Sequence, residues 1–150
     1  MLKDCSRYSA NTIENLICFF ALDTRQQINL IPSLNIETKF DFHDGDLVTD
    51  KALLVLANQY MDIINSLSIR LLVLDLESEL IILDAVMSDI YTWIDRQDWE
   101  SNSFWSKKGL LKSEWQFIRE LSSFIKQYLN IEVVVTSFCL EQIIADCLHP

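Results

Sequence analysis

The sequence predicts a mainly α-helical protein, a compact single domain of about five helices that spans residues 1–150. Only two glycines and two prolines occur, so the frequent turns that a β-sandwich or β-barrel needs are missing. Half of the residues are hydrophobic, and in most segments they recur at three- and four-residue steps, the spacing of one helix face. A chain of this length can bury enough surface to form a hydrophobic core.

The first predicted helix begins near Asn11, which we expect to be its N-cap, with Glu14 three residues later reaching back to the helix start. This helix should end near Asp23. Its apolar side chains form one stripe, made of Ile13, Leu16, Ile17 and Phe20. Residues 24–48 are less regular. Within them, segment 36–42 alternates as a strand would, although an extended loop over the core gives the same pattern.

Two longer helices are predicted in the middle of the chain. Thr49 or Asp50 can cap the first, which either breaks near Ser66 or continues. The second has the clearest pattern, because apolar residues recur at alternating three- and four-residue steps like the seam of a packed helix. That seam consists of Val73, Leu76, Leu80, Leu83, Met87, Ile90 and Ile94.

Residues 95–112 are predicted to form a loop, followed by a helix that Ser113 caps. Asn130 should end that helix. Its buried stripe is expected to consist of Trp115, Ile118, Leu121, Ile125 and Leu129.

The last segment is ambiguous. The β-branched residues at 131–135 favour a strand, whereas the spacing over 138–148 favours a final helix. A minor alternative is therefore a two-stranded element that pairs residues 36–42 with residues 131–135.

Charge is the strongest functional signal in the sequence. The chain has 22 acidic residues against 12 Lys and Arg, which gives a formal net charge of −10. Eight carboxylates and a single basic residue, Arg96, lie between Asp75 and Glu100. Such a protein repels nucleic acid and anionic membrane surfaces and attracts basic partners. We therefore expect no nucleic-acid partner and no membrane partner.

The sequence offers little for catalysis or cofactor binding. It has no glycine-rich phosphate loop, no closely spaced cysteine pair for zinc and no recognisable Ser-His-Asp set. We expect no catalytic residues, no cofactor and no bound metal. The first residues lack the apolar stretch of a signal peptide, and charges interrupt the most apolar segment, 69–83. The expected location is the cytoplasm.

The candidate partner-binding residues are acids and aromatics of the central region. They are Asp41, Asp44, Asp46, Glu77, Asp84, Asp95, Asp98, Trp99, Phe104 and Trp105. Three of the acids, Glu77, Asp84 and Asp95, fall on one flank of the predicted seam when successive residues are turned by about 100°. The alternative for these acids is an ordinary solvated face, and the alternative for the aromatics is that they fold back on the core.

The acids at 41–50 form a tight cluster that could hold a divalent cation, but the cluster lacks the ligand spacing of an EF-hand. The same cluster contains the first of four segments that match a family pattern. Asp41-Phe42-His43-Asp44 is similar to a D-F-x-D opening, and residues 83–89 are similar to L-D-x-x-L-x-x-M-S. Phe104-Trp105-Ser106 with Leu110 is similar to L-W-T…A-L, and residues 113–121 are similar to S-x-E-W-x-x-I-R-x-L.

These four segments, in this order over about residues 40–130, resemble a group of small bacterial immunity proteins. That group neutralises the toxins of contact-dependent growth inhibition and related polymorphic toxin systems. The resemblance implies a non-enzymatic protein that binds one cognate toxin domain, which is often a basic nuclease. Trp115 and Arg119 are expected to be structural, with Arg119 paired to a carboxylate such as Asp84 or Asp89.

Three functional classes follow from the sequence. The first is an immunity protein, monomeric when free, that neutralises a basic toxin domain by electrostatic complementarity. The second is an acidic helical adaptor or regulatory subunit, either monomeric or a homodimer through the 73–94 seam. The third is an enzyme that uses Asp41, His43 and Asp44 around a divalent ion.

Overall fold

The computed structural model describes residues 9–31, 48–73, 78–101 and 103–148. Within these ranges the fold is mainly helical, as the sequence predicts, with six α-helices and one short 3₁₀ helix. In chain order they are α1 (Ala10–Ala21), α2 (Thr24–Leu30), α3 (Val48–Val73), α4 (Ser78–Asp95), η1 (Gly109–Leu111), α5 (Trp115–Tyr128) and α6 (Ser137–Leu148).

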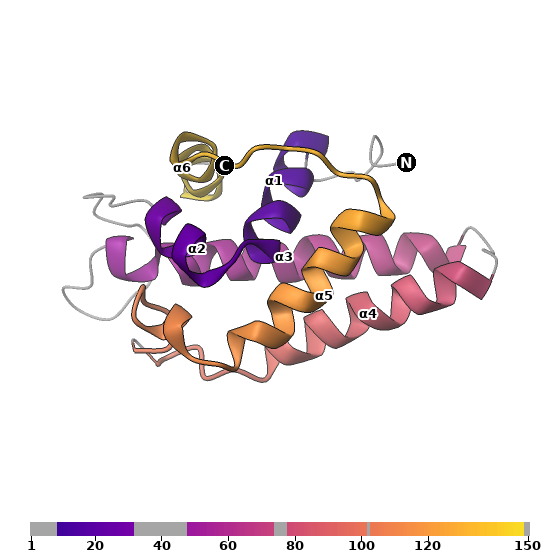
Figure 1. The fold of residues 1–150 in the computed structure, drawn as a ribbon, viewed down its shortest axis with the longest axis horizontal. Helices are drawn as coiled ribbons and strands as arrows, with labels where there is room; N and C mark the ends of the chain where they lie inside the picture. The colour runs from indigo at the N-terminus through magenta and orange to yellow at the C-terminus, as the bar shows by residue number, and fades with distance from the viewer. Residues whose placement is uncertain (1–8, 32–47, 74–77, 102, 149–150) are drawn as a thin grey trace.

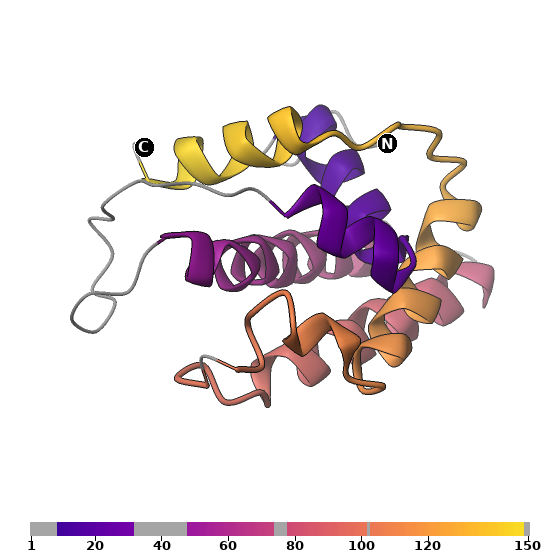
Figure 2. The same ribbon diagram turned by 60° about the vertical axis from the view of Figure 1, so that its left-hand side comes forward.

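The longest helix, α3, crosses the whole molecule, and α4 lies alongside it (Figure 1). The fifth helix crosses diagonally in front of this pair and packs on both α4 and α1. Figure 2 shows α6 along the upper edge, α3 through the middle and the α4–α5 pair at the lower right. The first helix, α1, contacts α3, α5 and α6 and so connects the α3–α4 pair to α5 and α6.

The start of the chain differs from the prediction at the first helix. Ser9, not Asn11, is the N-cap of α1, and the hydroxyl of Ser9 accepts a hydrogen bond from the backbone N–H of Thr12 at 3.2 Å. Asn11 lies inside the helix and accepts from the amide of Asn15 at 3.0 Å. The predicted end near Asp23 is confirmed, but Asp23 also caps the unforeseen helix α2 through a capping box with Gln26.

The described part of the predicted seam lies on α4, which begins later in the chain than predicted. The helix α3 continues past Ser66 to Val73, so Val73 belongs to α3 and the seam helix begins at Ser78. The described part of the seam is buried, with no side chain more than 1% exposed: Leu83, Met87, Ile90 and Ile94. These side chains belong to the core of the chain itself.

Of the two caps predicted for α5, the N-terminal one is wrong and the C-terminal one is confirmed. Ser113 is not the N-cap; that position is Glu114, which makes no capping hydrogen bond with its side chain. The backbone oxygen of Ser113 instead accepts from Gln116 at 3.0 Å, because the chain enters α5 through a turn. Asn130 ends the helix as predicted, with φ 53°, in the left-handed conformation that completes a Schellman motif.

The last segment contains the predicted helix α6, but residues 131–135 are not a strand. Their side chains do alternate: Ile131 is 4% and Val135 9% exposed, whereas Val134 is 85% exposed. The β-branched residues of 131–135 therefore reflect alternate burial of their side chains and not pairing in a sheet. The proposed partner segment, 36–42, lies outside the described residues. No described helix is long and apolar enough to cross a membrane.

A buried tyrosine links α3 to α5. The Tyr60 hydroxyl lies 2.7 Å from the hydroxyl of Ser122, and the Tyr60 ring is fully buried and stacks on Phe20 at 4.5 Å. Burial raises the pKa of Tyr60, although the hydrogen bond to Ser122 opposes this effect. The native state therefore keeps this phenol protonated at a pH where the unfolded chain loses the proton.

This shift predicts a loss of stability in alkali. Tyrosine in an unfolded chain titrates near pH 10, so above about pH 10 the unfolded state binds fewer protons than the native state. The free energy of unfolding should then fall by up to about 1.4 kcal/mol per pH unit. Denaturant titrations of the wild type and Tyr60→Phe from about pH 8 to about pH 11 measure this fall in the free energy of unfolding. The variant lacks the titrating hydroxyl, so its stability should fall less. A gap between the two proteins that stays constant with pH would contradict the prediction.

Candidate partner-binding surface

The structure gathers six of the predicted partner-binding residues on α4 and the loop that follows it. These are Asp84, Asp95, Asp98, Trp99, Phe104 and Trp105. The other four, Asp41, Asp44, Asp46 and Glu77, lie outside the described residues.

The loop after α4 closes the end of that helix. The last four carbonyl groups of an α-helix have no donor within the helix. Here the backbone N–H groups of Arg96 and Gln97 donate to the carbonyl oxygens of Thr92 and Ile94, at 3.1 Å each. The amide of Gln97 donates to the carbonyl oxygen of Trp93 at 2.7 Å, and the indole N–H of Trp99 donates to that of Asp95 at 3.4 Å. All four groups have a partner, so the chain direction after α4 is fixed.

Stacked aromatic rings tie this loop to the core. The rings of Trp99 and Trp105 stack with centroids 5.1 Å apart, and Trp105 meets Trp115 edge-on at 5.8 Å. The indole N–H of Trp105 also donates to the carbonyl oxygen of Asp98 at 2.9 Å. Trp105 is 1% and Phe104 6% exposed, so these two aromatics fold back on the core and are not exposed anchors. Trp99 remains partly exposed above them.

The second half of the loop is equally constrained. The hydroxyl of Ser106 donates to the carbonyl oxygen of Ser103 at 2.7 Å and accepts from the backbone N–H of Gly109 at 3.1 Å. A side chain on Gly109 would collide with the carbonyl group of Phe104, so only glycine fits this buried position. The loop is therefore a defined structure rather than a loose connection.

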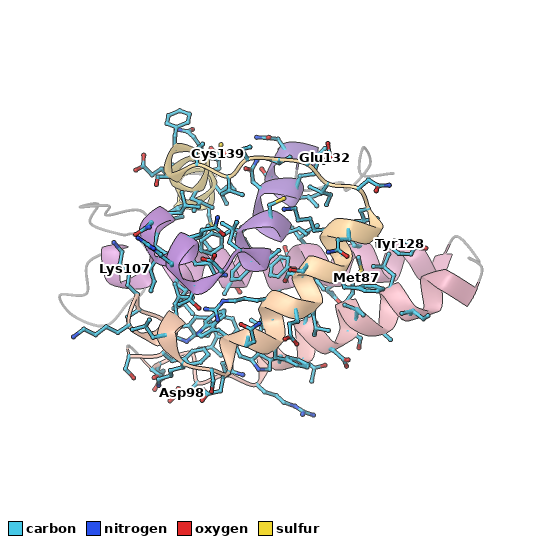
Figure 3. The ribbon with its side chains drawn as sticks, viewed as in Figure 1. Met87, Asp98, Lys107, Tyr128, Glu132 and Cys139 are labelled. Carbon is cyan, nitrogen blue, oxygen red and sulfur yellow. The ribbon has the colours of Figure 1, made fainter. Side chains whose placement is uncertain are left out.

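Three exposed carboxylates stand on this fixed frame. Asp95, Asp98 and Glu100 are all exposed, and we call them the acidic turn. The side chain of Asp98 accepts from the backbone N–H of Glu100 at 3.0 Å, which holds the Asp98 carboxylate against the backbone of the turn. In the described part of the chain, none of the three forms an ion pair. Figure 3 shows Asp98 at the lower edge of the molecule.

The position of the acidic turn costs stability. The C-terminal end of a helix carries partial negative charge, so Asp95 in the last turn of α4 is repelled, and that turn contains no basic residue. Arg96 supplies the only positive charge between Asp95 and Glu100. Each unfavourable charge at a helix end costs about 0.3–1 kcal/mol. Asp84 lies on the same flank of α4, but it is partly buried and already interacts within the chain.

Comparison with protein-family models, curated proteins and solved structures finds no match for this chain.

Arg119 has different partners from those expected. It is 5% exposed, and its guanidinium donates to the amide oxygen of Gln27 at 2.8 Å and to the carbonyl oxygen of Leu110 at 2.7 Å. The expected pairing with Asp84 or Asp89 is therefore wrong. Burial lowers the pKa of Arg119, and the negative charge of Asp23 partly opposes this change. The side chain joins α2, η1 and α5, which is a structural role.

A surface groove of about 380 Å³ lies between the α1–α2 turn and α5. Its lining includes Asp23, Gln116, Glu120, Ser123 and Phe124, with Arg119 at its buried side. Within the described ranges, no three His, Cys, Asp or Glu side chains gather closely enough to hold a metal ion. The groove can offer hydrogen bonds, negative charge and one aromatic wall to a side chain of another molecule.

The sequence prediction missed two kinds of surface residue. Glu100 belongs to the acidic turn. Its position two residues after Asp98 in the sequence already indicated that it is part of the same acidic segment. Phe117 and Phe124 on α5 are 44% and 38% exposed, and they lie outside the stripe predicted for that helix. Their seven-residue spacing was visible in the sequence, but only the structure distinguishes them from the aromatics that are buried.

Proposed function

We propose that the protein is a non-enzymatic binding protein that recognises a basic protein domain through the acidic turn. In its specific form, the proposal is that of an immunity protein that neutralises a cognate toxin domain. The observation that supports it best is the set of three exposed carboxylates at and just after the negative end of α4, on a backbone that hydrogen bonds hold in place. The resemblance of four segments to small immunity proteins supports the specific form.

The energetics of the acidic turn favour a binding role. Its charges repel one another and the end of α4, so they weaken the free protein, and a basic partner would relieve this repulsion. Because the loop is already ordered by Trp99, Trp105 and the caps of α4, binding costs little conformational entropy. Exposed charges of one sign also speed the encounter with an oppositely charged protein.

The described residues bear on one of the competing classes and not on the other. A homodimer through the 73–94 seam would need that seam at the surface, yet Leu83, Met87, Ile90 and Ile94 are buried within the chain. The residues suggested for an enzyme, Asp41, His43 and Asp44, lie outside the described ranges. An adaptor role remains the second candidate, and it would use the acidic turn in the same physical way.

The test is binding to a basic protein encoded next to this one. The product of the neighbouring reading frame should bind with a dissociation constant on the order of 1 nM, measured by calorimetry with purified proteins. Binding should weaken as salt rises, because exposed charges are screened. If a neighbouring product has a measurable toxic activity, an equimolar amount of this protein should abolish it. Failure of every neighbouring product to bind would overturn the proposal.

A further inference from the structure

The outer side of α5 carries a line of apolar side chains, of which Phe117 and Phe124 are exposed, whereas Leu121 and Tyr128 are partly buried against the core. Phe117, Leu121, Phe124 and Tyr128 follow one another at steps of four, three and four residues, so they form a single line along the helix. We call this line the outer stripe. The rings of Phe124 and Tyr128 stack with centroids 6.1 Å apart. Figures 1 and 3 show α5 along the front of the molecule, with Tyr128 towards the far end of the helix.

Packing of the core does not account for the two exposed members of the outer stripe, Phe117 and Phe124. The same helix buries the polar residues Arg119 and Ser122, while Phe117 is 44% and Phe124 38% exposed. Exposing large aromatic side chains forgoes stabilisation that burial would give. A row of exposed apolar residues on one element marks an interaction surface more often than single scattered ones do.

The groove beside α5 adds shape and charge to this surface. Phe124 belongs to both the outer stripe and the groove, so the two features are continuous. Asp23 and Glu120 line the groove and are exposed, whereas Arg119, the cation in the lining, is 5% exposed and donates to Gln27 and Leu110. An apolar wall with acids beside it suits an amphipathic side chain such as lysine or arginine, which presents an apolar stem and a cationic end.

The outer stripe begins close to the acidic turn. Phe117 lies two residues after Trp115, whose ring meets that of Trp93, in the last turn of α4, at 5.1 Å. Trp115 also contacts Trp105, which is hydrogen-bonded to the chain at Asp98. One end of α5 is therefore joined to the acidic turn through buried aromatic rings.

We propose that the outer stripe is the apolar centre of the surface that binds the basic partner, and that the acidic turn is its charged edge. This inference rests on the proposed function. The occupant is a folded basic domain whose lysine and arginine side chains face the acidic turn, Asp23 and Glu120. Its own apolar side chain packs against Phe117 and Phe124. Interfaces of this kind draw most of their affinity from a few aromatic anchors within a polar rim.

The experiment compares two double variants that each remove two exposed apolar side chains. Phe117→Ser with Phe124→Ser changes the outer stripe, and Val134→Ser with Phe138→Ser changes residues that are 85% and 67% exposed elsewhere. Calorimetry with the neighbouring gene product should give about 100-fold weaker binding for the stripe variant and less than about threefold for the control. The salt dependence should stay unchanged in both, because no charge is removed.

The outcomes separate this inference from the proposed function. If the wild type binds and the stripe variant binds equally well, the inference is overturned and the proposed function stands. If no neighbouring product binds the wild type, both are overturned. Hydroxyl-radical footprinting of the wild-type complex avoids any question of folding. Phe117 and Phe124 should become protected while Phe138 does not, and oxidation of all three as in the free protein would also overturn the inference.

Discussion

Replacing Trp115 by alanine should lower the free energy of unfolding by about 3–5 kcal/mol. Trp115 is fully buried, and its ring meets those of Phe20, Trp93, Phe104 and Trp105, with centroids 5.1–6.2 Å apart. These rings come from α1, α4 and the loop, so one side chain holds three parts of the fold together. Removing it leaves a cavity that the surrounding helices can fill only in part.

Two control variants show whether the effect comes from packing. The indole N–H of Trp115 is buried and has no acceptor among the described residues, so Trp115→Phe breaks no hydrogen bond and keeps an aromatic ring in place. That variant should lose clearly less stability than Trp115→Ala. On the same helix, Phe117→Ala removes a ring that is 44% exposed and should cost the least of the three. Chemical denaturation measures all three, and a loss below about 1 kcal/mol for Trp115→Ala would contradict the packing described here.

Loss of the Trp115 ring should also disturb the structure of the acidic turn. Trp105 packs on Trp115 and fixes the chain at Asp98 through its indole N–H, so the frame of the turn depends on the same cluster. In the Trp115→Phe variant this frame is retained, and partner binding should change little. Under the proposed function, the buried Phe104 and Trp105 would serve recognition indirectly, by holding the chain that carries the charged groups in place.

Helical periodicity was enough to predict most of the fold. The spacing of Leu83, Met87, Ile90 and Ile94 identified a buried seam, and Asn130 marked the end of α5. The short helix α2 escaped detection because its seven residues carry too little periodicity, and its capping box is the only strong local signal. The β-branched residues at 131–135 favoured a strand, which is wrong, because β-branching alone does not show whether another strand lies beside the segment.

The candidate site was harder to predict because exposure is decided by tertiary packing. Phe104 and Trp105 are buried, whereas Phe117 and Phe124 are exposed, although all four are large aromatics near the middle of the chain. The difference arises because the loop folds back onto Trp115. The burial of Arg119 likewise depends on Gln27 and Leu110, which are brought near it only by the fold. By contrast, the exposed acids Asp95 and Asp98 were identified from charge alone.

Reversing two charges in the acidic turn should slow partner binding strongly without weakening the fold. We expect Asp95→Lys with Asp98→Lys to reduce the association rate constant by about 10- to 100-fold at low salt. The free energy of unfolding should change by no more than about 1 kcal/mol, because favourable positive charge at the end of α4 offsets the loss of the hydrogen bond that the Asp98 side chain accepts from Glu100. Stopped-flow association with the neighbouring gene product at about 20 mM and about 500 mM salt measures the rate, and the difference should shrink at high salt.

The matched control makes the same change in net charge elsewhere. Glu132→Lys with Asp146→Lys replaces two exposed acids, and Figure 3 shows Glu132 at the edge opposite Asp98. If the acidic turn guides the partner, the control measured at about 0.1 M salt should slow association by less than about threefold, since charges farther from the interface than a Debye length of about 10 Å are then largely screened. Equal slowing by both pairs would mean that net charge alone governs the encounter. In that case the acidic turn is not the recognition site, and the fixed geometry of its loop has no role in binding.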